Sequence, residues 1–440
     1  MLNVKLQRRF ISLYVLYDLI KGKYVLTKAE KNPQYWMIAQ QKSIKKFVKH
    51  IYKIPFYRQK FDAVGILPKD IKTAEDFLKL PILTKEEYRR WILEKTENKD
   101  EFLHWINTRT TGSTGTPLVL FSLPRDRAAE IANLFRCALL QKKHYHVLKD
   151  RVFSTMVPKP KASKIFSIPY IKQMSSISTA EELVAGYNAT KPDFYYGNKT
   201  AILKIAQYAL KNHIQLHSAK CVGSISEPLD NNARKIIEDA FGVGKVFDIY
   251  GCSECGNFAV EKCGEPEIHI VWSDTHVINI INETDVLDKP GYKMGQLAIT
   301  SLIHYGFPVV NYVLGDIIEI KEEHGIKYIT KILGRSNDVI KNIDGSIYQW
   351  MHVSRIMSGL TDIRQFRVIQ KSYKKLVFVL AADKEISLKR KIEIERIISK
   401  RVIQYLGGTK EETRKEVMFE WCERIDPDQT GKVRMLISEV

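Results

Sequence analysis

Residues 193–213, "DFYYGNKTAILKIAQYALKNH", join a short strand pattern to a long helical one and decide the fold class. DFYYG is short, aromatic and ends in glycine, whereas apolar residues recur at helical spacing in the stretch that follows it. The alternation continues through AKCVGSIS (219–226), the helical NNARKIIEDAFG (231–242) and KVFDIYG (245–251). This pattern predicts an α/β domain with a substantially parallel sheet.

Other patterns extend this domain on both sides. Residues 269–281 (HIVWSDTHVINII) and 309–320 (VVNYVLGDIIEI) carry consecutive β signals, which predict an antiparallel continuation of the sheet. Upstream, apolar residues spaced for one buried face predict a long helix from about Arg125 to Leu148.

A change in pattern marks a domain boundary near LGRSNDVIKNIDG (333–345), where glycine, asparagine and aspartate cluster. We therefore expect a large N-terminal α/β domain of several sheets (1–333) and a small C-terminal α+β domain (334–440). The second domain combines strand patterns with one long basic helix; these are residues 364–370, 375–382 and 416–425 for the strands and 387–408 for the helix.

The composition is that of an ordinary globular protein, with 440 residues of which 45% are apolar. The six cysteines are scattered and no cleavable secretory signal is visible, so we expect reduced thiols and a cytoplasmic location. No apolar run reaches the roughly 18 residues that a membrane-spanning helix needs.

The formal charge of +19 is concentrated at one end of the chain. Residues 1–60 hold 14 lysines and arginines against only Asp18 and Glu30, a balance of +12. Basic and bulky apolar residues alternate there at helix-like spacing, which is typical of a peripheral contact with an anionic membrane. The alternative is a solvated basic face on helices that pack against the main body. No nucleic-acid recognition module is visible, so we expect no nucleic-acid partner.

The stretch NTRTTGSTGTPLVL (107–120) gathers hydroxyl side chains around Gly112 and Gly115. Glycines let the backbone approach a ligand closely, and neighbouring N–H and hydroxyl groups can donate hydrogen bonds to phosphate oxygens. It is not a Walker A loop, because Thr116 and Pro117 stand where that motif has lysine. Taken alone, the stretch is equally compatible with a hairpin turn that binds nothing.

Three further stretches follow it in a fixed order: DIYGCSECG (248–256), YVLGDIIEI (312–320) and DPDQTGKVRMLISEV (426–440). Together with the stretch at 107–120 and the boundary segment, they resemble the adenylate-forming superfamily of acyl-CoA synthetases and peptide-synthetase adenylation domains. The resemblance covers essentially the whole chain. It is closest to the branch of phenylacetate-CoA ligase, coenzyme F390 synthetase and the CapK-type capsule-biosynthesis proteins.

The resemblance implies a site for ATP and Mg²⁺ under a mobile C-terminal lid. Glu254 would bind Mg²⁺, and Lys432 would be brought in on the lid to stabilise charge in the transition state. Asn337 takes the hinge position, where many relatives have aspartate or lysine. The β- and γ-phosphates would be held by Thr110, Thr111, Gly112, Ser113, Thr114 and Gly115.

The resemblance also implies the contacts to the nucleoside. Tyr250 and Gly251 would lie beside the adenine, Asp316 would take the ribose hydroxyls, and Arg335 would contact the ribose or phosphate. Ser226 and Glu227 would border the adenine. Without the resemblance, Glu254 and Asp316 would be interpreted as ordinary turn or capping acids, and Lys432 as a solvated lysine.

The expected reaction is activation of a carboxylic acid as its acyl-adenylate, with release of pyrophosphate. The acyl group would then pass to a thiol, such as that of CoA, or to an amine on a sugar or glycan, and a capsule or surface-polysaccharide pathway would suit the basic N-terminus. The rival is a descendant of the same fold that binds nucleotide, or serves as a scaffold, without catalysis.

Three cysteines and one histidine are candidates for a structural metal site. Cys252, Cys255, Cys263 and His269 have a spacing that a structural zinc site would tolerate, although Glu254 lies between the first two; reduced structural cysteines are the alternative.

The acyl pocket is the part that the sequence predicts least. Tyr195, Tyr196 and Asn198 are candidates for its walls. Aromatic residues on strands are more often part of a hydrophobic core, so that alternative stays open.

Overall fold

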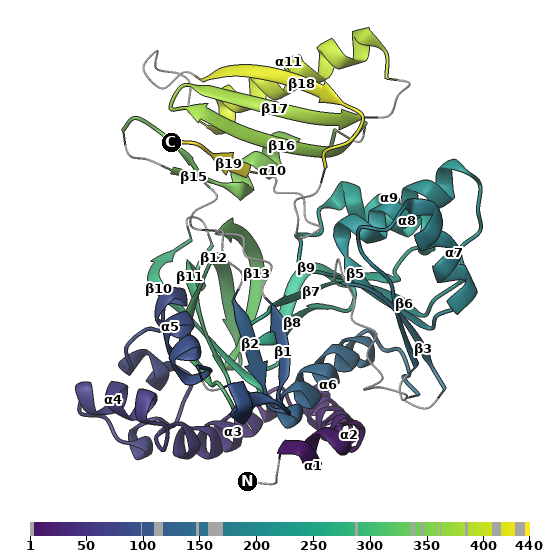
Figure 1. Ribbon diagram of the computed structural model, residues 1–440. Helices are drawn as coiled ribbons and strands as arrows, with labels where there is room; N and C mark the ends of the chain where they lie inside the picture. Colours follow the sequence, from purple (N-terminus) through teal and green to yellow (C-terminus); the bar gives the residue numbers. More distant parts are fainter. Residues whose placement is uncertain are drawn as a thin grey trace.

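The computed structural model places a large body below a small C-terminal domain (Figure 1). A sheet of 11 strands runs through the body. The residues described are 4–97, 99–109, 118–146, 149–156, 170–286, 289–335, 339–344, 347–357, 359–360, 362–382, 386–406, 415–426 and 436–440.

One half of the large sheet is parallel, as the alternation of strand and helix patterns predicts. Its strands lie in the order β4, β3, β5, β6, β7, and each pairs with its neighbours in parallel. The carboxyl ends of β5, β6 and β7 therefore reach the same edge of the sheet. The bounds are β3 (Arg151–Thr155), β4 (Tyr170–Gln173), β5 (Phe194–Asn198), β6 (Cys221–Ile225) and β7 (Val246–Cys252).

The other half is antiparallel and begins where β8 folds back against β7. The order continues through β8, β9, β13, β12, β11 and β10. The β-rich segments at 269–281 and 309–320 form part of it, which confirms the predicted continuation. The bounds are β8 (Gly256–Lys262), β9 (Glu265–Val271), β10 (His276–Asp285), β11 (Tyr292–Ser301), β12 (Val309–Glu323) and β13 (Ile326–Arg335).

Helices cover both faces of the parallel half because side chains alternate along each strand. On β5, Tyr195 packs into a core shared with α7, α8 and α9, and its neighbour Tyr196 packs into a second core shared with α2 and α6. The helices are α2 (Ile11–Lys31), α6 (Pro124–Leu140), α7 (Ala180–Thr190), α8 (Lys199–Lys211) and α9 (Asn231–Phe241).

Side chains that satisfy free backbone N–H groups fix where several helices begin. Thr84 accepts a hydrogen bond from the N–H of Glu87, and Asp230 accepts one from the N–H of Ala233. Thr179 and Glu182 cap each other's N–H groups reciprocally. These starts follow directly from the sequence, because the capping residue precedes each helix.

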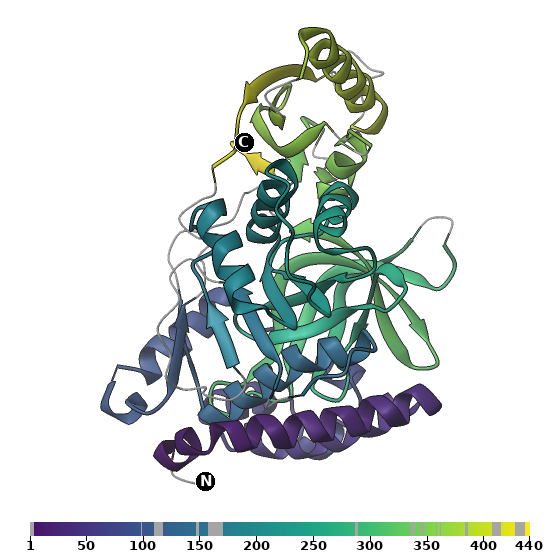
Figure 2. The ribbon, with the colours of Figure 1, turned by 90° about the vertical axis from the view of Figure 1, so that its right-hand side faces the viewer.

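The N-terminal helices lie at the end of the body away from the small domain, with α2 along its outer edge (Figure 2). Helices α3 to α5 cover the antiparallel half, where their apolar faces share one core with β10, β11 and β12. The bounds are α1 (Val4–Arg9), α3 (Tyr35–Ile51), α4 (Pro55–Ala63), α5 (Lys85–Lys95) and the 3₁₀ turns η1 (Pro68–Asp70), η2 (Glu75–Lys79) and η3 (Lys99–Phe102).

The small domain is α+β, as predicted. A four-stranded sheet in the order β18, β17, β16, β19 packs against α10 and α11. The exact division at 333/334 stays a prediction. The bounds are β14 (Val339–Lys341), β15 (Ile347–Gln349), α10 (Trp350–Met357), β16 (Ile363–Ser372), β17 (Lys375–Ala382), α11 (Leu388–Tyr405), β18 (Glu416–Cys422) and β19 (Leu436–Ser438).

One predicted helix is shorter than expected. Helix α6 ends at Leu140 rather than near Leu148, because the chain leaves the helical conformation at Lys142, which adopts a positive φ of 56°. Within the described parts of the chain, none of the helices is both long enough and apolar enough to cross a bilayer.

Candidate functional site

The residues predicted for the nucleoside gather at the edge where the parallel strands end. Ser226 and Glu227 directly follow β6, and Tyr250 lies near the end of the adjacent β7. Asp316 comes from β12, several strands away in the sheet, yet its Oδ2 accepts a 2.6 Å hydrogen bond from the Tyr250 hydroxyl. The candidates for the adenine and for the ribose therefore lie side by side.

Asp316 also lies beside the next predicted contact. It is the register partner of Arg335 on β13, at the point where the chain leaves the body. The glycines before them, Gly315 and Gly334, have positive φ values of 86° and 96°, a conformation in which a side chain would be strained. The side chain of Arg335 lies outside the described part of the structure.

The turn between β7 and β8 carries Glu254, the predicted magnesium ligand. A Cβ atom added at Gly251 would lie 2.7 Å from the backbone oxygen of Gly256, so the strands can approach this closely only with glycine there. The Tyr312 hydroxyl donates a 3.1 Å hydrogen bond to Oε1 of Glu254. Burial, reinforced by the Glu254 carboxylate, raises the pKa of Tyr312 well above its ordinary value, so this hydroxyl stays a donor.

This geometry suits a hard divalent cation. Glu254 is partly exposed, and its carboxylate is oriented by a neutral donor rather than neutralised by a cationic side chain of the described residues. Carboxylate oxygens are the ligands that Mg²⁺ prefers, and Mg²⁺ usually takes one or two of them together with substrate phosphates.

The phosphate-binding stretch connects two short strands. Strands β1 (Ile106–Arg109) and β2 (Val119–Ser122) form an antiparallel hairpin in which Arg109 pairs with Val119. The residues that would contact phosphate connect these two strands in the sequence and lie outside the described residues, and Asn337 and Lys432 are also outside them. Their predicted roles, those of Thr110, Thr111, Gly112, Ser113, Thr114 and Gly115 included, stay predictions.

Glu227 has a clear structural partner. Its Oε2 accepts hydrogen bonds of 2.8 Å from both the backbone N–H and the hydroxyl of Thr200, in the first turn of α8. Ser226 adopts a positive φ of 75°, which turns the chain sharply after β6. Glu227 therefore ties the loop after β6 to the start of α8, and its contact with adenine stays a prediction.

The structure does not support the zinc site. Strand β8 is seven residues long and separates Cys255 at one end from Cys263 at the other, a span of roughly 23 Å at 3.3 Å per residue. His269 is engaged by Asp248 and by the Glu267 carbonyl, both at 3.1 Å. Among the described residues, no group of three or more His, Cys, Asp and Glu could hold a metal ion.

Cys252, Cys255 and Cys263 are free thiols, of which Cys255 is buried and Cys263 is exposed. Burial and a hydrogen bond with Cys252 raise the pKa of Cys255 well above its ordinary value, so it stays protonated.

The two candidate tyrosines for the acyl pocket belong to the hydrophobic cores. Tyr195 and Tyr196 are both 0% exposed, and the Tyr195 hydroxyl is 2.8 Å from that of Thr155. Both tyrosines therefore follow the alternative interpretation, in which aromatic residues on strands belong to a hydrophobic core. Asn198 is the residue before α8 and is also buried.

A buried polar cluster that no local sequence pattern predicts contacts the Glu254 turn through the Cys255 carbonyl. Nε2 of His276 lies 3.0 Å from the Cys255 carbonyl, and the Ser301 hydroxyl bridges His276 and His304. His304 in turn contacts Glu130 of α6 at 2.7 Å. Because these residues come from α6, β10 and the end of β11, no local pattern connects them.

The cluster has a definite charge state. Burial lowers the pKa of His276 to about 3, so this ring is neutral. Burial also opposes the charge on His304, but its hydrogen bond and charge interaction with Glu130 outweigh this and raise its pKa. Burial likewise opposes the charge on Glu130, but Arg127 and His304 lower its pKa to about 2. The pair is thus a buried ion pair at mildly acid pH.

Comparison with known proteins finds similarity to CapK and to phenylacetate-coenzyme A ligases. A family model described as the CapK C-terminal domain matches residues 340–439. Protein CapK of Staphylococcus aureus is 25% identical over 430 residues, covering 91% of this chain and 89% of that protein. Phenylacetate-coenzyme A ligase of Pseudomonas putida is 26% identical over 325 residues, covering 67% and 69%.

The fold is that of an adenylate-forming ligase. The structure of 2-hydroxyisobutyryl-CoA ligase in its postadenylation state, with 2-HIB-AMP, gives a TM-score of 0.70 at 17% identity, covering 91% of this chain and 89% of that one. The same enzyme in its thioesterification state, with 2-HIB-AMP and CoA, gives 0.54. The arrangement of the chain is therefore closer to the first of these two states.

The Tyr312 hydroxyl offers a test of the Glu254 turn. Tyr312→Phe removes only the donor to Glu254, so the carboxylate loses its orientation and affinity for ATP with Mg²⁺ should fall about tenfold. Affinity is measured from the rise in melting temperature with ATP and Mg²⁺. Tyr88→Phe is the matched control, because its ring packs against Tyr312 while its hydroxyl donates to the Phe307 carbonyl. Equal losses in both variants would refute the role given to Tyr312.

The His304–Glu130 pair predicts a pH-dependent stability. The raised pKa of His304 means that its contribution is fully present below its unfolded value of 6.5 and is lost as pH rises through the folded value. His304→Gln should therefore destabilise the fold by about 3 kcal/mol at pH 6 and by less at pH 9. Denaturant unfolding at both pH values measures this, with the exposed His144→Gln as control. If His304→Gln lowered the free energy of unfolding equally at both pH values, the charged pair would be contradicted.

Proposed function

We propose that this chain, which is similar to CapK and to the phenylacetate-CoA ligases and has the fold of an adenylate-forming ligase, activates a carboxylic acid with ATP and passes the acyl group to a thiol or an amine. The observation that carries the proposal is the meeting of the β7–β8 hairpin, which holds Tyr250 and Glu254, with β12: the Tyr250 hydroxyl donates to Asp316, and the Tyr312 hydroxyl donates to Glu254. The paired residues are 66 and 58 positions apart in the sequence, so their meeting at one edge of the sheet supports a nucleotide site.

Each residue would act on a different part of the substrate. Asp316, oriented by the Tyr250 hydroxyl, would accept hydrogen bonds from the ribose. The hairpin tip between β1 and β2 would donate backbone N–H and hydroxyl groups to the phosphates. Glu254 would hold Mg²⁺, which neutralises the departing pyrophosphate when bound. The carboxylate of the acid attacks the α-phosphorus, and the bond between the α-phosphorus and the oxygen that bridges it to the β-phosphate breaks. The products are the acyl-adenylate and pyrophosphate.

Lys432 would supply the positive charge that the phosphate-binding stretch lacks. Negative charge builds on the α-phosphate oxygens in the transition state, and a cation delivered by the lid stabilises it where water is excluded. Removal of that lysine by lid movement would then open the adenylate to the acceptor. The fold's likeness to a ligase in its postadenylation state is compatible with this order of events.

The acceptor would be CoA or an amino group on a sugar or glycan. The relatives named phenylacetate-coenzyme A ligase favour the thiol. The amine, and with it a role in capsule or surface-polysaccharide synthesis, rests on the resemblance to the CapK branch and on the basic N-terminus.

Pyrophosphate release tests the adenylation step directly. The protein is supplied with ATP, Mg²⁺ and a panel of aryl, fatty, hydroxy and amino acids, and one class should release pyrophosphate. In Lys432→Ala this release should fall about a hundredfold, because a transition-state contact is lost. Lys400→Ala is the matched control, as Lys400 is an exposed lysine of the same domain.

The outcome separates the two functional candidates. Release that one acid stimulates and that Lys432→Ala abolishes establishes adenylation. If no acid stimulates release while ATP still raises the melting temperature, the non-catalytic nucleotide-binding alternative holds instead.

We also propose that the enzyme works in peripheral contact with an anionic membrane, through an apolar stripe on α1 and α2. The stripe repeats at intervals of three and four residues, the spacing of one helix face. Its central members Leu13, Tyr17 and Ile20 are 61%, 61% and 63% exposed. The whole stripe consists of Leu6, Phe10, Leu13, Tyr17, Ile20 and Tyr24.

Charge favours a bilayer over a second copy of the chain. Lys21, Lys23, Lys28 and Lys31 lie on the same helix, and residues 1–60 carry a balance of +12. Two such faces would repel each other, whereas an anionic lipid surface complements both the charge and the apolar stripe.

Vesicle sedimentation tests this contact. The protein should pellet with phosphatidylglycerol vesicles at low salt, and Leu13→Gln/Tyr17→Gln/Ile20→Gln should reduce its affinity more than tenfold, since about 1.5 kcal/mol or more is lost per apolar side chain. Leu388→Gln/Ile392→Gln/Ile403→Gln is the control, because these are exposed apolar residues on α11. If the wild type does not pellet with the vesicles, the membrane proposal is wrong. If instead the wild type is a dimer and the Leu13→Gln/Tyr17→Gln/Ile20→Gln variant is a monomer, the stripe mediates self-association.

A further inference from the structure

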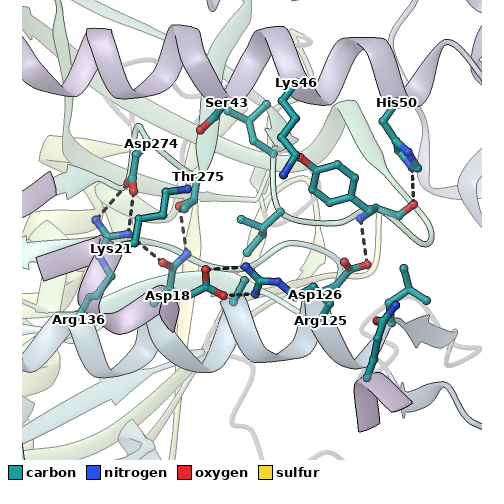
Figure 3. Close-up of a pocket in the computed structure, with 18 of the residues that line it drawn as sticks. Asp18, Lys21, Ser43, Lys46, His50, Arg125, Asp126, Arg136, Asp274 and Thr275 are labelled. Atoms are coloured by element: carbon teal, nitrogen blue, oxygen red, sulfur yellow. Dashed lines mark hydrogen bonds and ion pairs between the residues drawn. The ribbon is translucent and has the colours of Figure 1, made fainter. Parts of the chain in front are cut away.

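A cavity of about 570 Å³ lies among α2, α3 and α6, and its charge is strongly biased. Its lining includes six lysines and arginines against three aspartates, a net charge of +3. Of the residues predicted to bind the nucleotide, none that the structure describes lines it. Figure 3 shows Lys46 and His50 extending from α3, and Arg125, Asp126 and Arg136 from α6, around this space.

The acids of the cavity are already engaged. Asp18 of α2 is paired with Arg125. Asp274 pairs with Arg136 through two hydrogen bonds of 3.1 and 3.2 Å. Asp126 accepts hydrogen bonds of 2.9 Å from the backbone N–H groups of Tyr305 and Gly306.

The lysines are not neutralised in the same way. Lys21 comes from α2, Lys46 and Lys49 from α3, and Lys53 from the turn after it. None of the four has an ion pair with a carboxylate of the described residues; Lys46 has only the Tyr305 ring near its Nζ, at 5.7 Å from the centroid. An excess of positive charge therefore faces the cavity from two helices.

One wall of the cavity is built around a buried arginine. Arg136 is 1% exposed and lies 4.4 Å from the centroid of the Trp272 ring. A Cβ at Gly22 of α2 would lie 2.4 Å from Cδ of Arg136, so the helix can pass only with glycine at that position. Nε of Arg136 and Oδ1 of Asp126 are buried without a hydrogen-bond partner among the described residues.

We propose that this cavity binds a phosphate-bearing small molecule or headgroup, at a site separate from that of the nucleotide. A net charge of +3 matches a phosphomonoester dianion better than a single carboxylate, and clustered lysines recognise phosphate as a point charge. The volume falls in the range of ordinary small-molecule sites. Leu123, Leu302 and Ile303 add an apolar wall that suits the organic part of such a ligand.

Two sources of phosphate fit this chemistry, and two soluble probes distinguish them. Glycerol 3-phosphate is a phosphomonoester without acyl chains, whereas dihexanoyl phosphatidic acid carries the same group with short chains. Binding of both, or of the first alone, indicates a free phosphoester. Binding of the second alone indicates a lipid headgroup, whose chains would meet the stripe on α2, since Arg125 of the cavity lies 5.8 Å from the Tyr17 ring.

The test uses the full chain without ATP or acid, at constant ionic strength, with calorimetry as readout. Lys46→Ala/Lys49→Ala should weaken binding about tenfold or more, since two charged contacts are lost. Lys42→Ala/Lys45→Ala is the matched control, because these lysines lie on the same helix, are exposed and do not line the cavity. Its effect should stay below about twofold.

Three outcomes are decisive. A selective loss in the cavity variant, repeated by Lys21→Ala from the opposite helix, supports the site. Equal losses in the cavity variant and its control would show general attraction to a basic surface, and would overturn the proposal. So would the absence of binding of either probe to the wild type. Because no nucleotide is present, failure here leaves the adenylation proposal untouched.

Discussion

The close approach of β7 and β8 at Gly251 is the constraint on which the candidate site depends. The sheet changes there from parallel to antiparallel pairing, and the space that a Cβ would need is taken by the backbone of Gly256. The reversal exposes Glu254 on a tight turn and leaves Tyr250 at the end of β7, within reach of Asp316. A wider turn would separate the carboxylate from Tyr312, which orients it.

Buried charge holds the two halves of the body together around this turn. Glu130 of α6 reaches His304 after β11, and Arg136 of the same helix reaches Asp274 before β10. A buried ion is stable only when its partner and its other hydrogen bonds are in place. Helix α6 therefore fixes the position of the antiparallel strands relative to the parallel ones. The contact between His276 and the Cys255 carbonyl holds the Glu254 turn in place relative to this cluster.

Local patterns predicted much of this structure, and interactions across the sheet account for what they missed. The strand and helix alternation from 193 to 251 predicted the parallel half of the sheet. The structure does not support the zinc interpretation, because spacing along the chain does not reveal that β8 separates Cys255 from Cys263. His304 could not be found from sequence, since its role exists only through Glu130, 174 residues away.

The basic cavity and the apolar stripe, both at the N-terminal end, are each unfavourable for the isolated chain. Like charges held near one another destabilise a fold, and exposed apolar side chains gain nothing from water. A surface optimised for folding alone would mix acids among Lys21, Lys46 and Lys49 and place polar residues at Leu13 and Ile20. The sequence retains both features on neighbouring helix faces, next to an arginine and a glycine that fit each other closely. Such a combination is stabilised when an anion and an apolar surface are supplied from outside the chain.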